Sequence, residues 1–116
     1  MNKKLISKNH FHFIGIGGIG MSAIAMALIK KGYSVSGSDL VQNKETKSLK
    51  RLGAIIFDSQ IKKNIDFVIS KFQNHAINCV ISSAIKDENE ELYICKKNNL
   101  LIKNRSEILA RIMKSH

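Results

Sequence analysis

The residues of this chain best suited to chemistry are the four glycines of a G-I-G-G-I-G pattern at residues 15–20. A β-rich run at 11–14 precedes the pattern, and an apolar helical pattern follows it. Between a strand and a helix, glycines allow a tight turn and a close approach of the backbone to a phosphate. The free N–H groups of a helix N-terminus also favour an anion. We therefore predict a diphosphate site formed by the backbone of Gly17, Gly18, Ile19 and Gly20.

An acidic residue stands where a second ligand contact is expected. Asp39 ends the second predicted strand, nineteen residues after Gly20. In a domain that binds NAD, an acid at this place holds the ribose hydroxyls of adenosine. Alternatively, Asp39 caps the loop that follows the strand. These residues by themselves are consistent with a dinucleotide or with another nucleotide diphosphate.

The elements that would position these residues alternate along the chain. We expect strands at 10–16, 33–38, 54–57, 76–82 and 100–103, and helices at 19–31, 43–52, 87–98 and 106–114. Residues 60–75 contain an apolar cluster compatible with an extra helix, and Ser106 is a candidate N-cap. Alternating strands and helices predict an α/β fold with a Rossmann-like, doubly wound parallel sheet. We expect about five strands in the order 3-2-1-4-5.

Length and composition restrict the class of protein. The 116 residues suit one domain, and the net charge of +10 comes from lysines scattered along the chain. The sequence has no long basic tract, so we expect no nucleic-acid partner. No apolar run reaches the roughly 18 to 20 residues that span a bilayer. The basic start at 1–8 leads into a strand, unlike a signal peptide. We expect a cytoplasmic protein in which Cys79 and Cys95 are buried thiols.

Four segments together resemble a known family. They are H-F-I-G-I-G-G-I-G-M-S at 12–22, G-Y-S-V-S-G-S-D-L at 32–40, S-S-A-I followed by D-E-N-E-E within 82–91, and R-S-E-I-L-A at 105–110. In this order and spacing they resemble the N-terminal domain of the Mur ligases of peptidoglycan synthesis, in the branch that joins L-alanine to UDP-N-acetylmuramate. The resemblance covers nearly the whole chain from His10 onward.

The resemblance implies a function for the whole chain. Mur ligases have three domains, of which the first binds the UDP part of the substrate, the second binds ATP and Mg, and the third binds the amino acid. This chain has no G-x-x-x-x-G-K-[ST] sequence and ends where the ATP-binding strand of the family would begin. We therefore expect residues 1–116 to be an isolated first domain, without the central and C-terminal domains. It would bind UDP-N-acetylmuramate, need no cofactor of its own and carry no catalytic residue.

The resemblance also assigns site residues beyond the glycines. Asp39 and Leu40 would lie in the crevice that receives the nucleoside. Ser82 and Ser83 would bond uracil, ribose or phosphate, although a simple turn at the end of a strand also explains them. Arg105 would pair with phosphate, unless it forms a surface salt bridge.

Some residues depart from the family pattern or suggest other chemistry. Gln60 stands where a histidine is common, residues 89–91 read Asn-Glu-Glu in place of Asn-Pro-Glu, and residues 66–75 are longer than usual. His10 and His12 lie on one side of a strand, which would suit a metal pair, but no third ligand is evident.

Three other functions compete with this interpretation. The first is the corresponding domain of the recycling ligase that joins UDP-N-acetylmuramate to a ready-made peptide. The second is an NAD(P)-binding module of an oxidoreductase or a channel regulator, and the third is a non-catalytic nucleotide sensor. The tandem Gly17-Gly18 and the S-S-A-I sequence at 82–85 favour the ligase.

Overall fold

The computed structural model of the chain describes residues 8–114. Its strands are β1 (Asn9–Ile14), β2 (Ser34–Ser38), β3 (Ile55–Phe57), β4 (Ala76–Ile81) and β5 (Leu101–Asn104). Its helices are α2 (Met21–Lys30), α3 (Lys44–Arg51), α4 (Lys62–Lys71), α5 (Glu90–Lys97) and α6 (Arg105–Lys114). Most of the basic start of the chain, and its last two residues, lie outside the described range.

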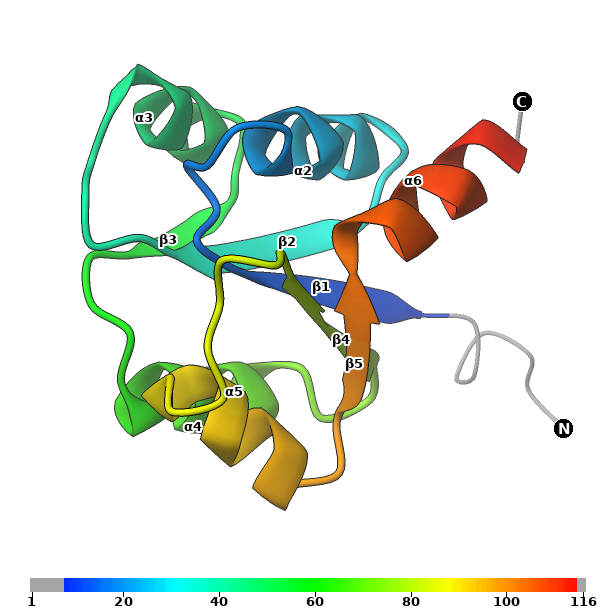
Figure 1. The fold of residues 1–116 in the computed structure, drawn as a ribbon. Coiled ribbons are helices and arrows are strands. Elements are labelled where there is room, and N and C mark those ends of the chain that lie inside the picture. The colour runs from blue at the N-terminus through cyan, green and yellow to red at the C-terminus, as the bar shows by residue number, and fades with distance from the viewer. Residues whose placement is uncertain (1–7, 115–116) are drawn as a thin grey trace, which may run out of the picture.

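The sheet is parallel throughout, in the predicted order β3-β2-β1-β4-β5. The chain runs outward from β1 through β2 to β3 and then returns to the other side of β1 as β4 and β5 (Figure 1). The direction of winding therefore reverses between β1 and β4. In doubly wound sheets, ligands bind at the carboxyl ends of the strands beside such a reversal.

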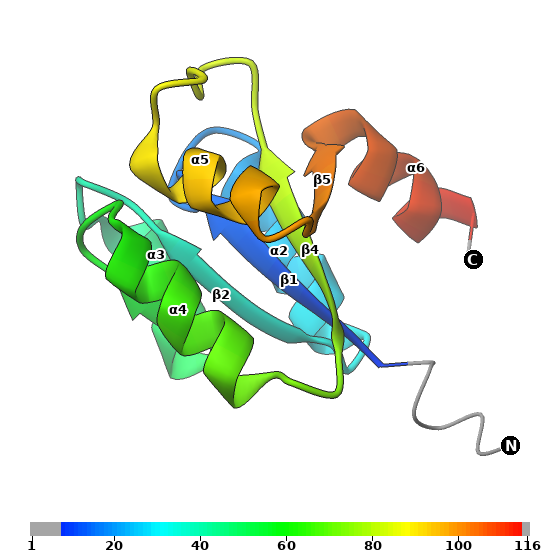
Figure 2. The same ribbon diagram turned by 90° about the horizontal axis from the view of Figure 1, so that it is seen from below.

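The helices form a layer on each face of the sheet. Helices α2, α3 and α6 cover one face, and α4 and α5 lie side by side against the other (Figures 1 and 2). Alternate residues of β1 point to opposite faces. Phe11 and Phe13 join the apolar core that contains residues of α2, α3 and α6, whereas Ile14 joins the core that contains residues of α4 and α5. The two histidines of β1, His10 and His12, point to the same face of the sheet as Ile14.

The predicted elements are present, with some corrected boundaries. Residues 60–75 do contain the extra helix, α4. Helix α5 begins at Glu90 rather than at residue 87, because Asn89 caps it by accepting a hydrogen bond from Leu92 N (3.1 Å). The residues between β4 and α5 are consequently a loop, which forms part of the site described below.

The predicted N-cap of the last helix was wrong. Helix α6 already includes Ser106, and Asn104 caps it instead. Asn104 Oδ1 accepts from Glu107 N (3.1 Å), and Asn104 N donates to Glu107 Oε1 (3.0 Å), which is a reciprocal capping box. Asparagine is at least as good an N-cap as serine. Ser106, inside the first turn, donates its hydroxyl to Asn104 Oδ1 (2.6 Å).

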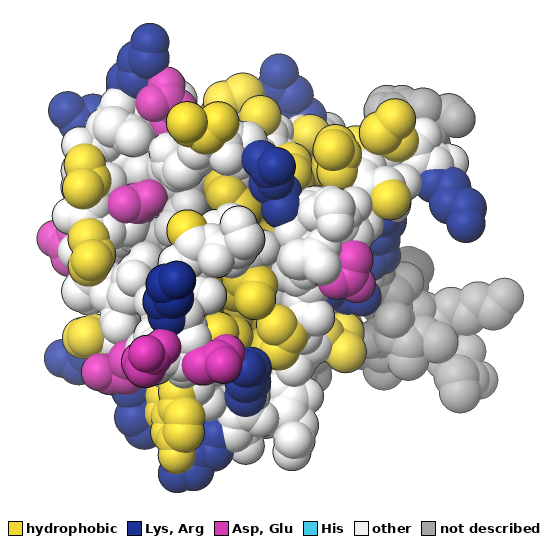
Figure 3. Space-filling model, viewed as in Figure 1, with side chains coloured by type: hydrophobic (Ala, Val, Ile, Leu, Met, Phe, Trp, Pro, Cys, Tyr) yellow, Lys and Arg dark blue, Asp and Glu magenta, His cyan; other side chains and the backbone are white. Residues whose placement is uncertain are grey.

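The surface carries its positive charge in dispersed form. On the face seen in Figure 3, Lys and Arg side chains are spread around the molecule rather than gathered in one stripe. None of the helices within residues 8–114 combines the length and apolar character that a bilayer crossing requires.

Candidate functional site

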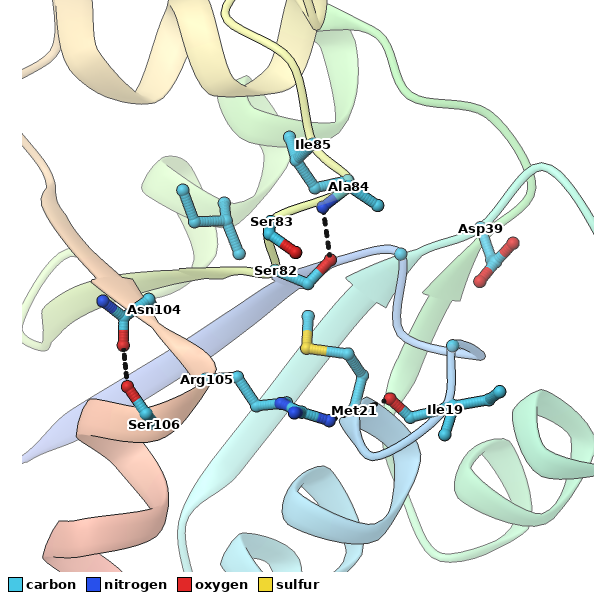
Figure 4. Close-up of a pocket in the computed structure, with 13 residues that line it drawn as sticks. Ile19, Met21, Asp39, Ser82, Ser83, Ala84, Ile85, Asn104, Arg105 and Ser106 are labelled. Atoms are coloured by element: carbon cyan, nitrogen blue, oxygen red, sulfur yellow. Dashed lines mark hydrogen bonds between the residues drawn. The ribbon is translucent and has the colours of Figure 1, made fainter.

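An open cleft of about 900 Å³ lies at the carboxyl end of the sheet, where the winding reverses. Its walls are the turn after β1, the loop after β4 and the junction of β5 with α6 (Figure 4). Six of the nine predicted site residues line it: Gly18, Ile19, Asp39, Ser82, Ser83 and Arg105. The other three, Gly17, Gly20 and Leu40, are not among its lining residues.

In the glycine turn, residues 15–20, the backbone N–H groups of the first four residues form hydrogen bonds within the protein. Gly15 N and Ile16 N both donate to Ser38 O, at 2.8 and 2.9 Å. Gly17 N donates to Asp39 Oδ2 (2.8 Å), and Gly18 N donates to Gly15 O (3.1 Å). These four N–H groups are therefore used within the protein.

The next two N–H groups of the turn remain available. Within residues 8–114, no acceptor is recorded for Ile19 N or Gly20 N. Gly20 is the N-cap of α2 and has φ +82°, a left-handed conformation that a glycine adopts without cost. Both donors thus stand at the positive end of the α2 dipole, where an anion is stabilised. Ile19 and Gly20 therefore carry the unbonded donors of the turn, and contact of Gly17, Gly18, Ile19 and Gly20 with a diphosphate stays a prediction.

Arg105 brings a full positive charge to the same place. It is the first residue of α6, and its Nη1 donates to Ile19 O (3.2 Å), so its side chain crosses the cleft to the glycine turn (Figure 4). No carboxylate within residues 8–114 forms a salt bridge with it, which differs from the surface ion pair considered as an alternative. The guanidinium and the two free N–H groups together form a compact set of donors suited to phosphate oxygens.

Asp39 is engaged with backbone donors. Its Oδ2 accepts from Gly17 N (2.8 Å) and its Oδ1 accepts from Val41 N (3.0 Å). A Cβ on Gly17 would lie only 2.9 Å from Oδ2, so the carboxylate occupies the space that a side chain there would need. This is the loop-capping role considered for Asp39; a contact with a ribose stays a prediction. The neighbouring Leu40 is 69% exposed.

The two serines after β4 form the wall opposite the glycine turn. Ser82 Oγ accepts from Ala84 N (3.3 Å), and Ser82 O accepts from Ile85 N (3.1 Å), so they do form a turn at the end of the strand. Ser83 is exposed in the cleft, and no protein partner is recorded for its hydroxyl within the described residues. Ser82 Oγ only accepts in its bond with Ala84, so among the described residues the O–H groups of both serines have no acceptor. The ligand contacts of both remain predictions.

The histidines of β1 lie away from the cleft, inside a buried polar network. His10 contacts Ser34 Oγ and Ser36 Oγ (2.7 Å each), and His12 contacts Ser36 Oγ (2.7 Å) and Glu91 Oε1 (3.0 Å). Burial, with the charges of His12 and His75 nearby, lowers the pKa of His10 to about 3. Among the described residues no group of three or more His, Cys, Asp or Glu is arranged to hold a metal.

The sequence includes Glu91 in the family-like D-E-N-E-E segment at 87–91, but gives no sign that its side chain is buried. Charged residues are normally left solvated, yet Glu91 has no exposed surface. The predicted thiols behave as expected: Cys79 and Cys95 are free and buried. A hydrogen bond between the two thiols, together with burial, raises the pKa of Cys79.

Two departures from the family pattern meet at one junction. Asn89 Nδ2 donates to Gln60 Oε1 (2.9 Å), so the residue at the expected histidine position contacts the start of α5. Glu90, which takes the place of a proline, accepts from Lys62 N (2.6 Å) at the first turn of α4. The two departures therefore stabilise the same contact between the beginnings of α4 and α5.

Comparison with known proteins gives a consistent result. The family model described as Mur ligase family, catalytic domain, matches residues 10–116. A UDP-N-acetylmuramate–L-alanine ligase of Prochlorococcus marinus subsp. pastoris is 87% identical over the whole chain, and another from P. marinus strain SARG is 51% identical over 90% of it. The chain spans 24% and 22% of these relatives. The crystal structure of UDP-N-acetylmuramate–alanine ligase from Thermotoga maritima matches with a TM-score of 0.75 and 28% identity, over 91% of this chain and 23% of that one.

Proposed function

This chain belongs to the Mur ligase family, and from that premise we propose that it binds the UDP part of UDP-N-acetylmuramate for the ATP-dependent addition of L-alanine. The names of the two curated relatives support the alanine-adding enzyme over the recycling ligase. Because the chain spans about a quarter of those relatives and has no G-x-x-x-x-G-K-[ST] sequence, we assign ATP and Mg to domains that lie outside residues 1–116.

The observation that carries this proposal is the set of donors on one side of the cleft. Two backbone N–H groups without a recorded acceptor, at Ile19 and Gly20, stand beside the guanidinium of Arg105, which forms no salt bridge within residues 8–114. A diphosphate has acceptor oxygens and negative charge for all three, and hydrogen bonds between charged groups are the strong ones. The cleft volume of about 900 Å³ is in the range of small-molecule sites, so a nucleotide sugar fits it.

The names of the curated relatives support a uridine nucleotide over NAD. Each carboxylate oxygen of Asp39 accepts one backbone N–H group and can accept a second hydrogen bond, so Asp39 does not decide between the two ligands. We infer that Asp39 shapes the crevice, and that the nucleoside lies between Leu40 and the open hydroxyl of Ser83.

The proposal is tested by calorimetry and thermal melting with UDP-N-acetylmuramate, UDP, uridine, NAD and NADP. We expect the two ligands with a uridine diphosphate group, UDP-N-acetylmuramate and UDP, to bind. A ligand at 100 times its Kd should add about 2.7 kcal/mol of stability. Arg105→Ala should weaken both by roughly ten- to a hundredfold, the value of a hydrogen bond to a charged group, and leave uridine unaffected. Arg51→Ala, which removes an exposed arginine of α3, is the matched control. Stabilisation by NAD or NADP but by neither uridine diphosphate would overturn the proposal.

A further inference from the structure

The buried carboxylate of Glu91 connects segments that are far apart in the sequence. It receives hydrogen bonds from His12 Nε2 (3.0 Å), Ser38 Oγ (2.7 Å) and Asn64 Nδ2 (2.6 Å). These donors belong to β1, β2 and α4, and Glu91 itself lies in the first turn of α5. A buried charge is costly unless it is paired and fully hydrogen-bonded, so this arrangement must be held tightly.

The distances are compatible with a directed chain of hydrogen bonds. With Nε2 of each histidine as the donor, His12 donates to Glu91, and its Nδ1 accepts from the Ser36 hydroxyl. His10 then donates to Ser36 Oγ and accepts from the Ser34 hydroxyl. Every donor points the same way, and the relay ends on the Glu91 carboxylate. Such connected networks have stronger bonds than isolated pairs and fix a unique geometry.

From Ser38 the network reaches the glycine turn directly. The Ser38 hydroxyl donates to Glu91, while the Ser38 carbonyl accepts from Gly15 N and Ile16 N at 2.8 and 2.9 Å. The next residue, Asp39, holds Gly17 N. Thus the residue that Glu91 fixes is also the one that anchors the first half of the turn, and its neighbour anchors the third residue.

In the other direction, Glu91 fixes the opposite wall of the cleft. The loop that carries Ser82 and Ser83 leads into α5, and Asn89, two residues before Glu91, caps that helix. Because Glu91 is in the first helical turn, its position sets where this loop ends. Both walls of the cleft are therefore attached to one carboxylate that is itself completely buried.

We propose that Glu91 is a positioning residue of the nucleotide cleft, which sets the separation between the glycine turn and the Ser82-Ser83 wall. Glu91 does not contact the ligand. It acts on the two walls of the cleft through Ser38 and through the first turn of α5. The inference rests on the proposed function for the identity of the ligand. Its structural part, the coupling of Glu91 to the two walls, does not depend on which nucleotide binds.

The test compares Glu91→Gln with Asn78→Ala. Gln keeps the shape of Glu but presents an amide N–H₂ to one of the three donors. Asn78 is also buried and polar, but its amide bonds to Asn9, to His10 O and to Ala76 O at the opposite end of the sheet. Asn78→Ala therefore serves as a control for general destabilisation.

Two readouts separate positioning from stability at a temperature where each variant is folded. In ligand-free protein, Glu91→Gln should shift the amide resonances of residues 15–17 and 82–84, and Asn78→Ala should not. In calorimetry with UDP-N-acetylmuramate, Glu91→Gln should raise Kd by roughly tenfold, as loss of a supporting contact does at other sites, while Asn78→Ala leaves Kd unchanged. If the unaltered chain bound no uridine nucleotide, the proposed function would fail and the resonance test would still decide this inference.

A second variant covers the case in which Glu91→Gln does not fold. Ser38→Ala removes the hydroxyl that links Glu91 to the turn but leaves the carboxylate bonded to His12 and Asn64. It should shift the residue 15–17 amides and weaken binding in the same direction. The inference is overturned if the variants lower only the melting temperature, as Asn78→Ala does, with the amide resonances of both walls and Kd unchanged.

Discussion

Substituting Gly20 by alanine tests the geometry of the donor set, and Gly32 provides a control with a similar positive φ. Gly20 has φ +82° and Gly32, which follows the C-cap of α2, has φ +95°. A non-glycine residue in the left-handed region costs about 1–2 kcal/mol. The smaller conformational freedom of unfolded alanine returns about 0.4–1 kcal/mol. Each variant should therefore lose about 1 kcal/mol of unfolding free energy, or roughly 4 °C in melting temperature.

The two positions differ in what a new methyl group meets. At Gly32 a Cβ has no neighbour within 4 Å, whereas at Gly20 it would collide with the Arg105 guanidinium, whose Cζ lies 3.2 Å away. The guanidinium ends a flexible side chain and can move cheaply, so the stabilities of the two variants should match. Moving it, however, removes its bond to Ile19 O and its place beside the two free N–H groups.

Affinity for UDP-N-acetylmuramate should therefore separate the variants. Loss of one charge-assisted contact predicts a roughly tenfold higher Kd for Gly20→Ala, and no change for Gly32→Ala. Urea unfolding and calorimetry on the same samples give both quantities. Equal stability together with equal affinity would refute the placement of the phosphate beside Arg105 and Gly20.

Two further predictions concern stability. Asn43 and Thr46 form a capping box at α3, with bonds of 3.0 Å in each direction, so Asn43→Ala should cost about 1 kcal/mol in urea unfolding and the nearby Lys47→Ala less than about 0.5 kcal/mol. Burial lowers the pKa of His10 to about 3. Below the unfolded pKa near 6.5, the unfolded chain binds a proton that the native state does not. The unfolding free energy should therefore decrease as the pH is lowered from 6.5 to 3, by up to about 1.4 kcal/mol per pH unit. His10→Gln should flatten this slope between pH 6.5 and 5, and an unchanged slope would show that His10 is not the group responsible.

Much of the fold was predictable because its signals are local. The glycine turn, Gly32 after α2, and the β-rich runs specify their elements within a few residues, and the alternation of strands and helices then specifies the sheet order. The α4 segment was harder to assign, since its N-cap, Ile61, makes no side-chain hydrogen bond and therefore gives no start signal. The misplaced cap of α6 arose because two suitable residues stand close together in sequence.

The site was predictable only in part, because its hydrogen bonds join distant segments. Sequence indicates that residues 15–20 can approach a phosphate, but not that Gly17 N is already bonded to a carboxylate 22 residues later. Glu91 resembles any solvated helix residue until the donors at His12, Ser38 and Asn64 are brought together, at separations of 79, 53 and 27 residues. Only the folded sheet makes its burial possible.

The most direct test of the central claim is a titration of isotope-labelled protein with UDP-N-acetylmuramate, followed by the backbone amide resonances of the glycine turn. We predict the largest changes at Ile19 and Gly20, the two amides without an acceptor in residues 8–114, together with the Arg105 side chain. Gly17 and Gly18, whose N–H groups are already bonded, should change less. Saturable binding that leaves the Ile19, Gly20 and Arg105 resonances unmoved would contradict the account.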